Sequence, residues 1–272
     1  MEAYKATAKN LSNWLKENHP EIKEIREITP EHIQEWINDR ATNWSVRTLE
    51  NHLSRIKYME EQAQRAYPKS KIEFYKDDLT KPETKASQRN KMMDKSDFER
   101  LREAMSRSRS YAKDAIEISY RCGLRVNEVA CLKREDIDLE NRTIHVSREG
   151  AKNGRERYVP IRDKDTDYFK GLLEKHPEDG YLSKISPDAI NRAIGRALDK
   201  LEDAEGHSLD EKYKGNKEHA IRKLYATERM REERGNLPLT DHMQEMKCWD
   251  TVSKELGHGA GREALYKTYC KG

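Results

Sequence analysis

Residues 122–138, CGLRVNEVACLKREDID, decide how the second half of this chain is interpreted. Apolar residues recur in this stretch at helical spacing, which predicts a helix packed against a core. Arg125 and Glu128 lie among them, three positions apart and therefore on one helical face. A half-buried arginine needs an anionic partner, and Glu128 can serve as one. The expected packing residues are Leu124, Val126, Val129, Ala130 and Leu132.

Two interpretations of this pair are open. In the first, Arg125 and Glu128 form an ordinary ion pair within a helix. In the second, Glu128 holds Arg125 ready for a phosphate. Gly123 precedes Leu124-Arg125 and permits a tight turn into the helix, and helix N termini attract phosphate. An arginine at such a position, with a carboxylate behind it, forms a pre-positioned fork for an anion.

Three further polar motifs follow along the chain. Lys152 lies in GAKNG between two strand-like runs, and its Asn-Gly pair favours a tight hairpin. His219 and Arg222 are three residues apart and project from one face of a predicted helix. His258 lies between glycines in Leu-Gly-His-Gly. Taken singly, each motif is typical of a solvated surface.

In this order, Gly-Leu-Arg-x-x-Glu, the basic hairpin, His-x-x-Arg, Leu-Gly-His and a tyrosine near the end resemble the tyrosine recombinase family, also called phage integrases. The resemblance covers residues 96–270 by motifs and residues 1–80 loosely. It implies a mainly α fold with a small β-sheet, in which a helical core-binding domain precedes a mixed α/β catalytic domain. It also implies site-specific cleavage and rejoining of DNA strands through a covalent 3′-phosphotyrosyl intermediate.

The resemblance also implies roles around the scissile phosphate. Two arginines would grip its non-bridging oxygens, a hairpin lysine would protonate the departing 5′-oxygen, two histidines would hydrogen-bond the phosphate, and a glutamate would hold the first arginine. The first histidine could also accept the proton of the nucleophile. Fixed cations and donors stabilise the charge that develops on phosphate oxygens in the transition state. In the same order, these residues are Arg125 and Arg222, Lys152, His219 and His258, and Glu128.

The predicted nucleophile is Tyr269, with Tyr266 as the alternative. A phenol has a pKa near 10, so it needs a nearby base or cationic surroundings to react. In the family the tyrosine usually follows the last histidine by about nine residues, whereas Tyr266 follows His258 by eight and Tyr269 by eleven. Treating Ala260-Gly261 as a two-residue insertion brings Tyr269 into register.

The chain is expected to have two domains joined by a linker. Residues 1–80 are predicted to form a helical DNA-binding domain, residues 81–95 a basic linker and residues 96–272 a catalytic domain. Residues 81–95 and residues 145–162 each carry five positive and two negative charges, which fits a groove that meets phosphate. Solvated lysine and arginine faces would give the same pattern. Residues 235–247 are predicted to be a surface insertion of unknown use.

Local signals place several helix ends. Thr29 precedes Pro30, which predicts an N-cap followed by a proline in the first turn. Ser96 and Glu99 have the spacing of a capping box at the start of the second domain. The other predicted helices cover 3–18, 45–66, 97–106, 111–122, 163–175, 187–203, 219–233, 249–257 and 262–270, and the predicted strands cover 143–146 and 157–161.

The composition fits a folded, highly charged protein of the cytoplasm. The 272 residues are 38% charged and 35% hydrophobic, with a net charge of +3. The four cysteines form no CxxC motif, so neither a zinc site nor a disulfide framework is expected. The sequence has no run of eighteen apolar residues, no phosphate-binding glycine loop and no carboxylate cluster with metal-ligand spacing. We therefore expect no membrane span, no ATP requirement and no metal or other cofactor.

The expected partner is double-stranded DNA with a specific target site. A homotetramer on two duplexes and accessory DNA-bending proteins are implied by the resemblance alone. Two other functions remain open from the sequence. A type IB topoisomerase-like enzyme would use the same chemistry to relax DNA, and a non-catalytic DNA-binding accessory protein would keep the scaffold without forming a covalent adduct.

Overall fold

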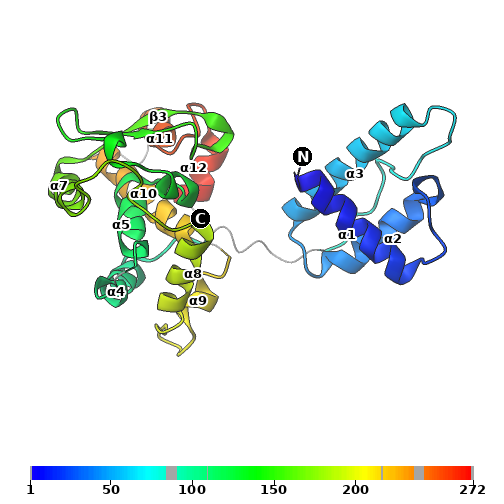
Figure 1. The fold of residues 1–272 in the computed structure, drawn as a ribbon, viewed down its shortest axis with the longest axis horizontal. Coiled ribbons are helices and arrows are strands. Elements are labelled where there is room, and N and C mark those ends of the chain that lie inside the picture. Colours follow the sequence, from blue (N-terminus) through cyan, green and yellow to red (C-terminus); the bar gives the residue numbers. More distant parts are fainter. Residues whose placement is uncertain (1, 84–90, 109, 216, 236–241, 271–272) are drawn as a thin grey trace. The chain divides into compact units, whose positions relative to one another are not determined.

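The computed structural model divides the chain into two compact units, Met1–Ser87 and Gln88–Gly272, with separate hydrophobic cores (Figure 1). The prediction of a mainly helical chain with a small sheet is confirmed. None of the helices formed by the described residues is long and apolar enough to cross a membrane. The structure describes residues 2–83, 91–108, 110–215, 217–235 and 242–270.

In the first unit, the described residues form three α-helices whose apolar faces meet in one core. Thr29 is the N-cap of the second helix and precedes Pro30 in its first turn, as predicted. The core contains the fully buried side chains of Ile33, Trp36 and Ile56. The helices are α1 (Glu2–Asn18), α2 (Pro30–Ala41) and α3 (Val46–Ala66), with the 3-10 turn η1 (Ile25–Glu27) between α1 and α2.

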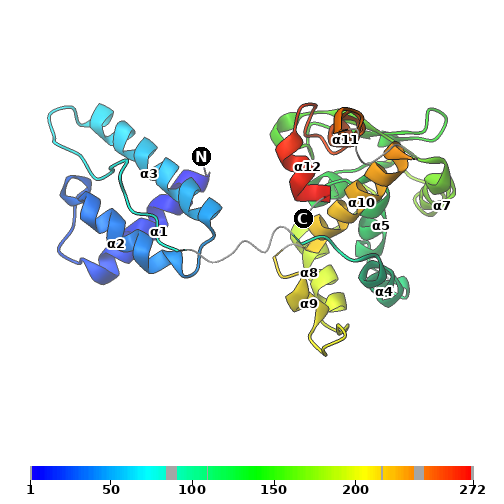
Figure 2. The same cartoon turned by 180° about the vertical axis from the view of Figure 1, so that it is seen from behind.

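The second unit is arranged around the long helix α10 (Lys217–Arg234), which contacts α5, α8, α11 and α12 (Figures 1 and 2). Because neighbours lie on several sides of α10, even charged side chains such as Arg222 and Lys223 are fully buried there. The other helices are α4 (Lys95–Ser106), α5 (Ala112–Cys122), α6 (Val126–Ala130), α7 (Thr166–Lys175), α8 (Pro187–Leu198), α9 (Leu209–Lys212), α11 (His242–Glu255) and α12 (Glu263–Cys270).

A three-stranded antiparallel sheet, in the order β1-β2-β3, lies between α6 and α7 in the sequence. Ile144 pairs with Val159 in the register of β2 and β3, and both side chains are fully buried. The prediction of a tight hairpin at Asn153-Gly154 was wrong. Both residues do adopt positive φ, at 60° and 64°, but they lie inside the longer loop 147–156. The strands are β1 (Ile137–Asp138), β2 (Thr143–Val146) and β3 (Arg157–Pro160), and the 3-10 turns are η3 (Arg134–Asp136), η4 (Lys152–Gly154) and η5 (Asp163–Asp165).

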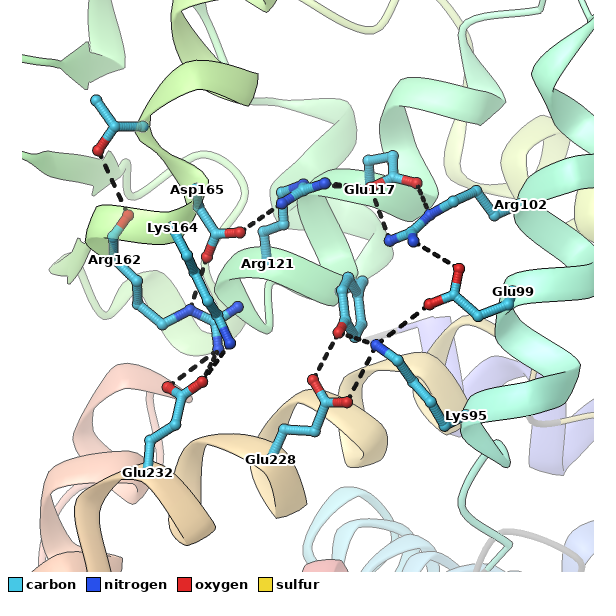
Figure 3. Close-up of polar contacts among 12 residues, drawn as sticks. Lys95, Glu99, Arg102, Glu117, Arg121, Arg162, Lys164, Asp165, Glu228 and Glu232 are labelled. Atoms are coloured by element: carbon cyan, nitrogen blue, oxygen red, sulfur yellow. Dashed lines mark hydrogen bonds and ion pairs between the residues drawn. The ribbon is translucent and has the colours of Figure 1, made fainter. Parts of the chain in front are cut away.

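A chain of ion pairs connects α4, α5 and η5 (Figure 3). Glu117 on α5 receives hydrogen bonds from Arg102 and Arg121, and Arg121 also donates to the buried Asp165. Arg162 donates to the other oxygen of Asp165 at 2.7 Å. Since Asp165 is buried, these bonds compensate its loss of hydration and fix η5 against α5.

Helix α4 begins two residues earlier than the capping-box pattern predicted. Its N-cap is Asp94, whereas Ser96 lies inside the helix, so that prediction was wrong. Asp97 is turned inward instead, where it accepts hydrogen bonds from Lys212 at 2.7 Å and from the hydroxyl of Tyr213 at 2.8 Å. A tertiary contact therefore decides the role of this carboxylate.

The predicted linker 81–95 is only partly a linker. Residues 84–90 of it lie outside the described residues. Met93 is fully buried in the core of the second unit, and its N–H donates to the carbonyl of Ala220 on α10 at 3.1 Å. The last residues of the predicted linker thus belong to the second unit.

Candidate active site

The stretch 122–138 does not form one helix, which corrects our prediction. Helix α5 ends at Cys122, and Gly123 follows in the left-handed region with φ of 61°. The short helix α6 then begins with Arg125 as its N-cap, at φ −74° and ψ 154°. A Cβ on Gly123 would lie 2.3 Å from the ring of Tyr225, so only glycine fits this turn. The turn places Arg125 at a helix start rather than inside a helix.

Glu128 holds Arg125 through two hydrogen bonds. One carboxylate oxygen of Glu128 accepts the backbone N–H of Arg125 at 2.8 Å, and the other accepts its Nη1 at 2.8 Å. The Glu128 side chain is fully buried, whereas that of Arg125 keeps 21% of its exposure. Glu128 therefore forms the expected ion pair with Arg125 and still leaves part of the Arg125 side chain exposed to solvent.

Arg157 on β3 is a second partner of Glu128, and the sequence analysis did not identify it. Its Nη1 and Nη2 donate to the two carboxylate oxygens at 2.9 and 2.8 Å. Burial would raise the pKa of Glu128, but these hydrogen bonds and the charges of Arg157 and Arg222 outweigh burial and hold it at about 2. One feature of the sequence indicates that Arg157 faces inward. Arg157 is two residues from the buried Val159 and therefore lies on the same face of the strand.

Arg222 lies at the centre of the site, on α10. Its side chain is fully buried, and Nη1 and Nη2 donate to the backbone carbonyls of Gly123 and Leu256. Nη1 is also 3.9 Å from the carboxylate of Glu128. Burial and the nearby charge of Arg222 lower the pKa of Arg125. Arg125, Arg157 and Arg222 thus surround the carboxylate of Glu128, and this concentration of positive charge favours the binding of an anion.

Tyr269 on α12 reaches the same cluster. Its hydroxyl is 3.2 Å from Nε2 of His258 and accepts a long hydrogen bond, 3.5 Å, from Nε of Arg222. Gly257, with φ of 71°, turns the chain after α11 so that His258 faces the hydroxyl. Burial, followed by the charges of Arg222 and Arg125, lowers the pKa of His258 to about 3. His258 is therefore neutral at neutral pH, and its Nε2 can accept a hydrogen bond from the hydroxyl of Tyr269.

His219 completes the cluster from the first turn of α10. Its ring lies edge-on to the ring of Tyr269, with a centroid separation of 5.4 Å and an interplanar angle of 77°. Since His219 and Arg222 are one helical turn apart, both face α12. The structure thus brings together six of the predicted site residues: Arg125, Glu128, His219, Arg222, His258 and Tyr269.

Lys152 is separate from this cluster. It is exposed in the loop 147–156, and among the described residues no hydrogen bond or ion pair of its side chain is found. Lys152 and Arg125 line one hollow of about 920 Å³, together with Ser186 and Pro187 at the start of α8. A group bound in this hollow could therefore meet both Arg125 and Lys152.

Tyr266, the alternative nucleophile, points elsewhere. Its hydroxyl donates to the carboxylate of Glu245 on α11, and burial and this carboxylate raise its pKa. Glu245 lies in the segment 235–247 that we predicted to be a surface insertion. Residues 242–247 begin α11 and most of them are exposed, while residues 236–241 lie outside the described residues. The buried Glu245 connects this segment to Tyr266 on α12.

A group of histidines and glutamates in the first unit has the composition of a metal site. Ligand atoms of His19, Glu21 and His32 lie within 4.8 Å of one another. However, Nδ1 of His32 accepts the N–H of Thr29 at 3.0 Å, so its proton is on Nε2, and that nitrogen has no lone pair for a metal. Both ring nitrogens of His19 face carboxylates, those of Glu21 and Glu35. Nδ1 of His32 and both ring nitrogens of His19 are therefore engaged in hydrogen bonds within the protein.

This fold, with two arginines, two histidines and a tyrosine converging on α10, defines the class of tyrosine recombinases. The model of the phage integrase family matches residues 91–241, more than half of the chain. The chain therefore belongs to the phage integrase family, whose members are enzymes that cleave and rejoin DNA strands.

Solved structures share the fold over nearly the whole chain. The Tn1549 transposon integrase in complex with transposon right end DNA is 17% identical, with a TM-score of 0.66 over 98% of this chain and 88% of that chain. A lambda integrase tetramer bound to a Holliday junction is 16% identical, with a TM-score of 0.65 over 96% and 71%. The XerH site-specific recombinase bound to difH substrate is 16% identical, with a TM-score of 0.63 over 98% and 74%. No curated protein matches the chain.

Proposed function

We propose that this protein is a site-specific recombinase that cleaves and rejoins duplex DNA through a 3′-phosphotyrosyl bond to Tyr269. The observation that carries the proposal is the position of the Tyr269 hydroxyl, which lies between Nε2 of His258 and Nε of Arg222. These three residues come from separate elements, and their meeting supports a chemical role better than an accidental contact. The family assignment supports the same reaction.

In the proposed reaction, the phenolic oxygen of Tyr269 attacks the scissile phosphorus, and the bond from phosphorus to the 5′-oxygen breaks. His219, whose ring lies edge-on to that of Tyr269, accepts the phenolic proton, and neutral His258 accepts a hydrogen bond from the hydroxyl. Lys152, which lines the same hollow as Arg125, gives a proton to the departing 5′-oxygen. The phosphotyrosyl bond conserves the energy of the phosphodiester, so the reverse reaction can rejoin a strand without ATP.

Arg125 and Arg222 are proposed to neutralise the non-bridging oxygens of the phosphate. Fixed cations act most strongly in a water-poor site, and removal of one comparable donor costs about 2.7–4 kcal/mol of transition-state stabilisation in other enzymes. The Nε edge of Arg222 now faces the hydroxyl of Tyr269. A phosphate bound at this edge would therefore lie next to the hydroxyl of Tyr269.

The larger assembly is proposed from the resemblance. Both units would contact the phosphate backbone of the duplex. Two duplexes would meet on a homotetramer, with accessory DNA-bending proteins where the site requires them. The lambda integrase structure is a tetramer on a Holliday junction, which supports this arrangement. With DNA as its substrate, the protein would work in the cytoplasm, on the nucleoid.

The test is covalent trapping on DNA. A library of nicked duplexes with randomised cores is incubated with the protein, and denaturation-resistant adducts are isolated and sequenced. We expect an adduct on a restricted set of sequences for the wild type and for Tyr266→Phe, and none for Tyr269→Phe. An adduct that survives Tyr269→Phe but is lost in Tyr266→Phe would overturn the choice of nucleophile.

Two other outcomes would change the function itself. Absence of any adduct from the folded wild type would favour the non-catalytic DNA-binding protein. Efficient relaxation of a supercoiled plasmid that lacks the selected site would favour the type IB topoisomerase-like enzyme.

A further inference from the structure

Arg157 uses each of its three side-chain nitrogens in a hydrogen bond to the protein. Nη1 and Nη2 are used on the carboxylate of Glu128, at 2.9 and 2.8 Å. Nε donates to the backbone carbonyl of Glu255, the last residue of α11, at 2.6 Å. The side chain keeps only 10% of its exposure. Its charge is paired directly with the carboxylate of Glu128, whereas Arg222 donates to neutral carbonyls, so Arg157 acts on the protein rather than on a ligand.

The two ends of this contact support different parts of the site. On one side, Glu128 bears the hydrogen bonds that hold Arg125 and lies 3.9 Å from Arg222. On the other side, the carbonyl of Glu255 is three residues before His258. A favourable place for a cation is the carboxyl end of a helix, where carbonyl groups lack partners. Arg157 therefore connects the arginine pair to the turn that carries the histidine.

The turn after α11 is built against Arg157. A Cβ on Gly257 would lie 2.9 Å from Nη1 of Arg157, so the backbone approaches the guanidinium as closely as glycine allows. The N–H of His258 closes the turn on the carbonyl of Ser253 at 2.9 Å. Arg222 donates to the carbonyl of Leu256 in the same turn. Two arginines thus fix three successive residues before His258.

Lysine could not replace Arg157 in this role. A planar guanidinium can bind both carboxylate oxygens and present Nε in a third direction, whereas an ammonium group is a single point charge. Without the fork, each carboxylate oxygen of Glu128 would keep only its hydrogen bond from Arg125. Arg125 and Arg222 are the nearest cations, so they would be drawn toward Glu128 and away from a phosphate.

We propose that Arg157 is a positioning residue for strand cleavage, which locks Glu128 to the carboxyl end of α11 so that Arg125, Arg222 and His258 are aligned with Tyr269. Its effect on cleavage rests on the proposed function, whereas its effect on the turn at His258 does not. The two effects can therefore be measured separately.

The first experiment measures single-turnover cleavage on the selected nicked duplex, together with DNA affinity. We expect Arg157→Lys to slow adduct formation by about 10²-fold, as a misplacement of about 1 Å does in other enzymes. DNA affinity should stay within about threefold, because Arg157 does not reach the surface. Arg142→Lys, in an exposed pair with Asp163 next to the same sheet, is the matched control and should cleave like the wild type. Circular dichroism confirms that each variant is folded.

The second experiment tests whether Arg157 acts through Glu128. In a double-mutant cycle, Arg157→Lys should cost much less in a Glu128→Gln background, because the carboxylate to be held is gone. Full additivity of the two losses, or wild-type cleavage by Arg157→Lys, would overturn the proposal while leaving the proposed function intact.

The third experiment needs no DNA and no activity. Hydrogen exchange at the N–H groups of Gly257 and His258 should become at least tenfold faster in Arg157→Lys, while exchange in α7 stays unchanged. If the wild type forms no adduct, the proposed function fails, and this measurement still decides whether Arg157 holds the turn. Unchanged exchange at both amides would overturn the proposal.

Discussion

Tyr266 and Tyr269 lie one turn apart on α12, and their hydroxyl groups have opposite surroundings. Tyr269 faces a neutral histidine and a buried arginine. Tyr266 faces the buried carboxylate of Glu245, which stabilises the protonated phenol. A phenol beside a carboxylate is a poor nucleophile because ionisation would place two negative charges together. At the scale of single residues, the charge of the neighbouring groups, rather than position along the chain, distinguishes the two tyrosines.

Tyr266→Phe should therefore destabilise the protein without preventing cleavage. The substitution removes the donor to Glu245 and leaves a buried carboxylate oxygen with less compensation, at a cost of about 1–3 kcal/mol in the free energy of unfolding. Denaturant unfolding measures this cost. Tyr158→Phe, at a site with 69% exposure on β3, is the control and should change stability by no more than about 0.5 kcal/mol. Equal stability of the two variants would remove the structural role of Tyr266.

His258 should make the stability of the protein depend on pH. Its pKa is about 3 in the folded protein, against an ordinary value of 6.5. As the pH falls below about 6.5, the unfolded chain binds a proton that the folded imidazole does not, so this residue lowers stability as the pH approaches 3. Since the side chain is partly exposed, we expect at most about 1 kcal/mol per pH unit.

The measurement is the difference in free energy of unfolding between His258→Asn and the wild type from pH 7 to pH 5. The variant should gain relative to the wild type as the pH falls. A difference is needed because Glu218 acts in the opposite direction: burial raises its pKa to about 7, so its contribution falls as the pH rises above 4.5. A constant difference across this range would contradict the low pKa of His258.

At the scale of elements, the junction of α5 and α6 determines where Arg125 lies. Gly123 ends α5 in a left-handed conformation, and its carbonyl accepts a hydrogen bond from Arg222. The same few atoms thus end one helix, start the next and bind the central arginine. A short helix such as α6 is not stable by itself, so these contacts must hold it in place.

Gly123→Ala should be strongly destabilising. The new Cβ would have to adopt φ of 61° and would overlap the ring of Tyr225, so we expect a loss of at least about 2 kcal/mol in the free energy of unfolding. Gly171→Ala is the matched control: Gly171 is inside α7, and a Cβ there meets no atom of the described structure within 4 Å. This control should gain about 0.5–1 kcal/mol, because alanine is the better helix former. Similar losses in both variants would contradict the geometry of the turn.

Helix α12 has only eight residues and depends on α10 for its position. Nζ of the buried Lys223 donates to the carbonyl of Thr268 at 2.8 Å, and Oγ1 of Thr227 donates to the carbonyl of Tyr269 at 3.1 Å. Both donors lie near the carboxyl end of α12, where free carbonyl groups favour a cation. The nucleophile candidate is thus held by the same helix that carries Arg222.

At the scale of the whole molecule, the two units have separate cores, and the chain between them includes a basic segment. We expect both units to contact the DNA backbone. The affinity of the full chain for DNA should then fall more steeply with salt than that of a fragment covering residues 88–272. Each additional phosphate contact should add about 0.9 to the slope of log K against log salt. Binding titrations at several salt concentrations measure the slopes.

The control for this comparison is a thermal melt of the fragment, which should be cooperative because its core is complete. Equal slopes for the full chain and a folded fragment would exclude residues 1–87 from the DNA interface.

Predictions from the sequence succeeded where the deciding contact joins residues close in the chain, and they failed where it joins residues far apart in the chain. The helices of the first unit and the pairing of Arg125 with Glu128 were predictable, because helical periodicity and a spacing of three residues are local properties. Arg157 was missed because its partners are 29 and 98 residues away. The start of α11 was missed because residues 242–247 are mostly polar, and the partners of the buried Glu245, Tyr266 and Arg234, are distant in the sequence.

The sequence by itself determined the class of protein, the order of its helices and the residue types available for phosphate chemistry, since these depend on local patterns and motifs. Only the tertiary structure decided that Tyr269, and not Tyr266, lies beside His258 and Arg222. The two tyrosines have nearly the same local sequence context. What distinguishes them is the rotation of one short helix against α10 and α11, and this rotation is set by packing and buried charge rather than by local spacing.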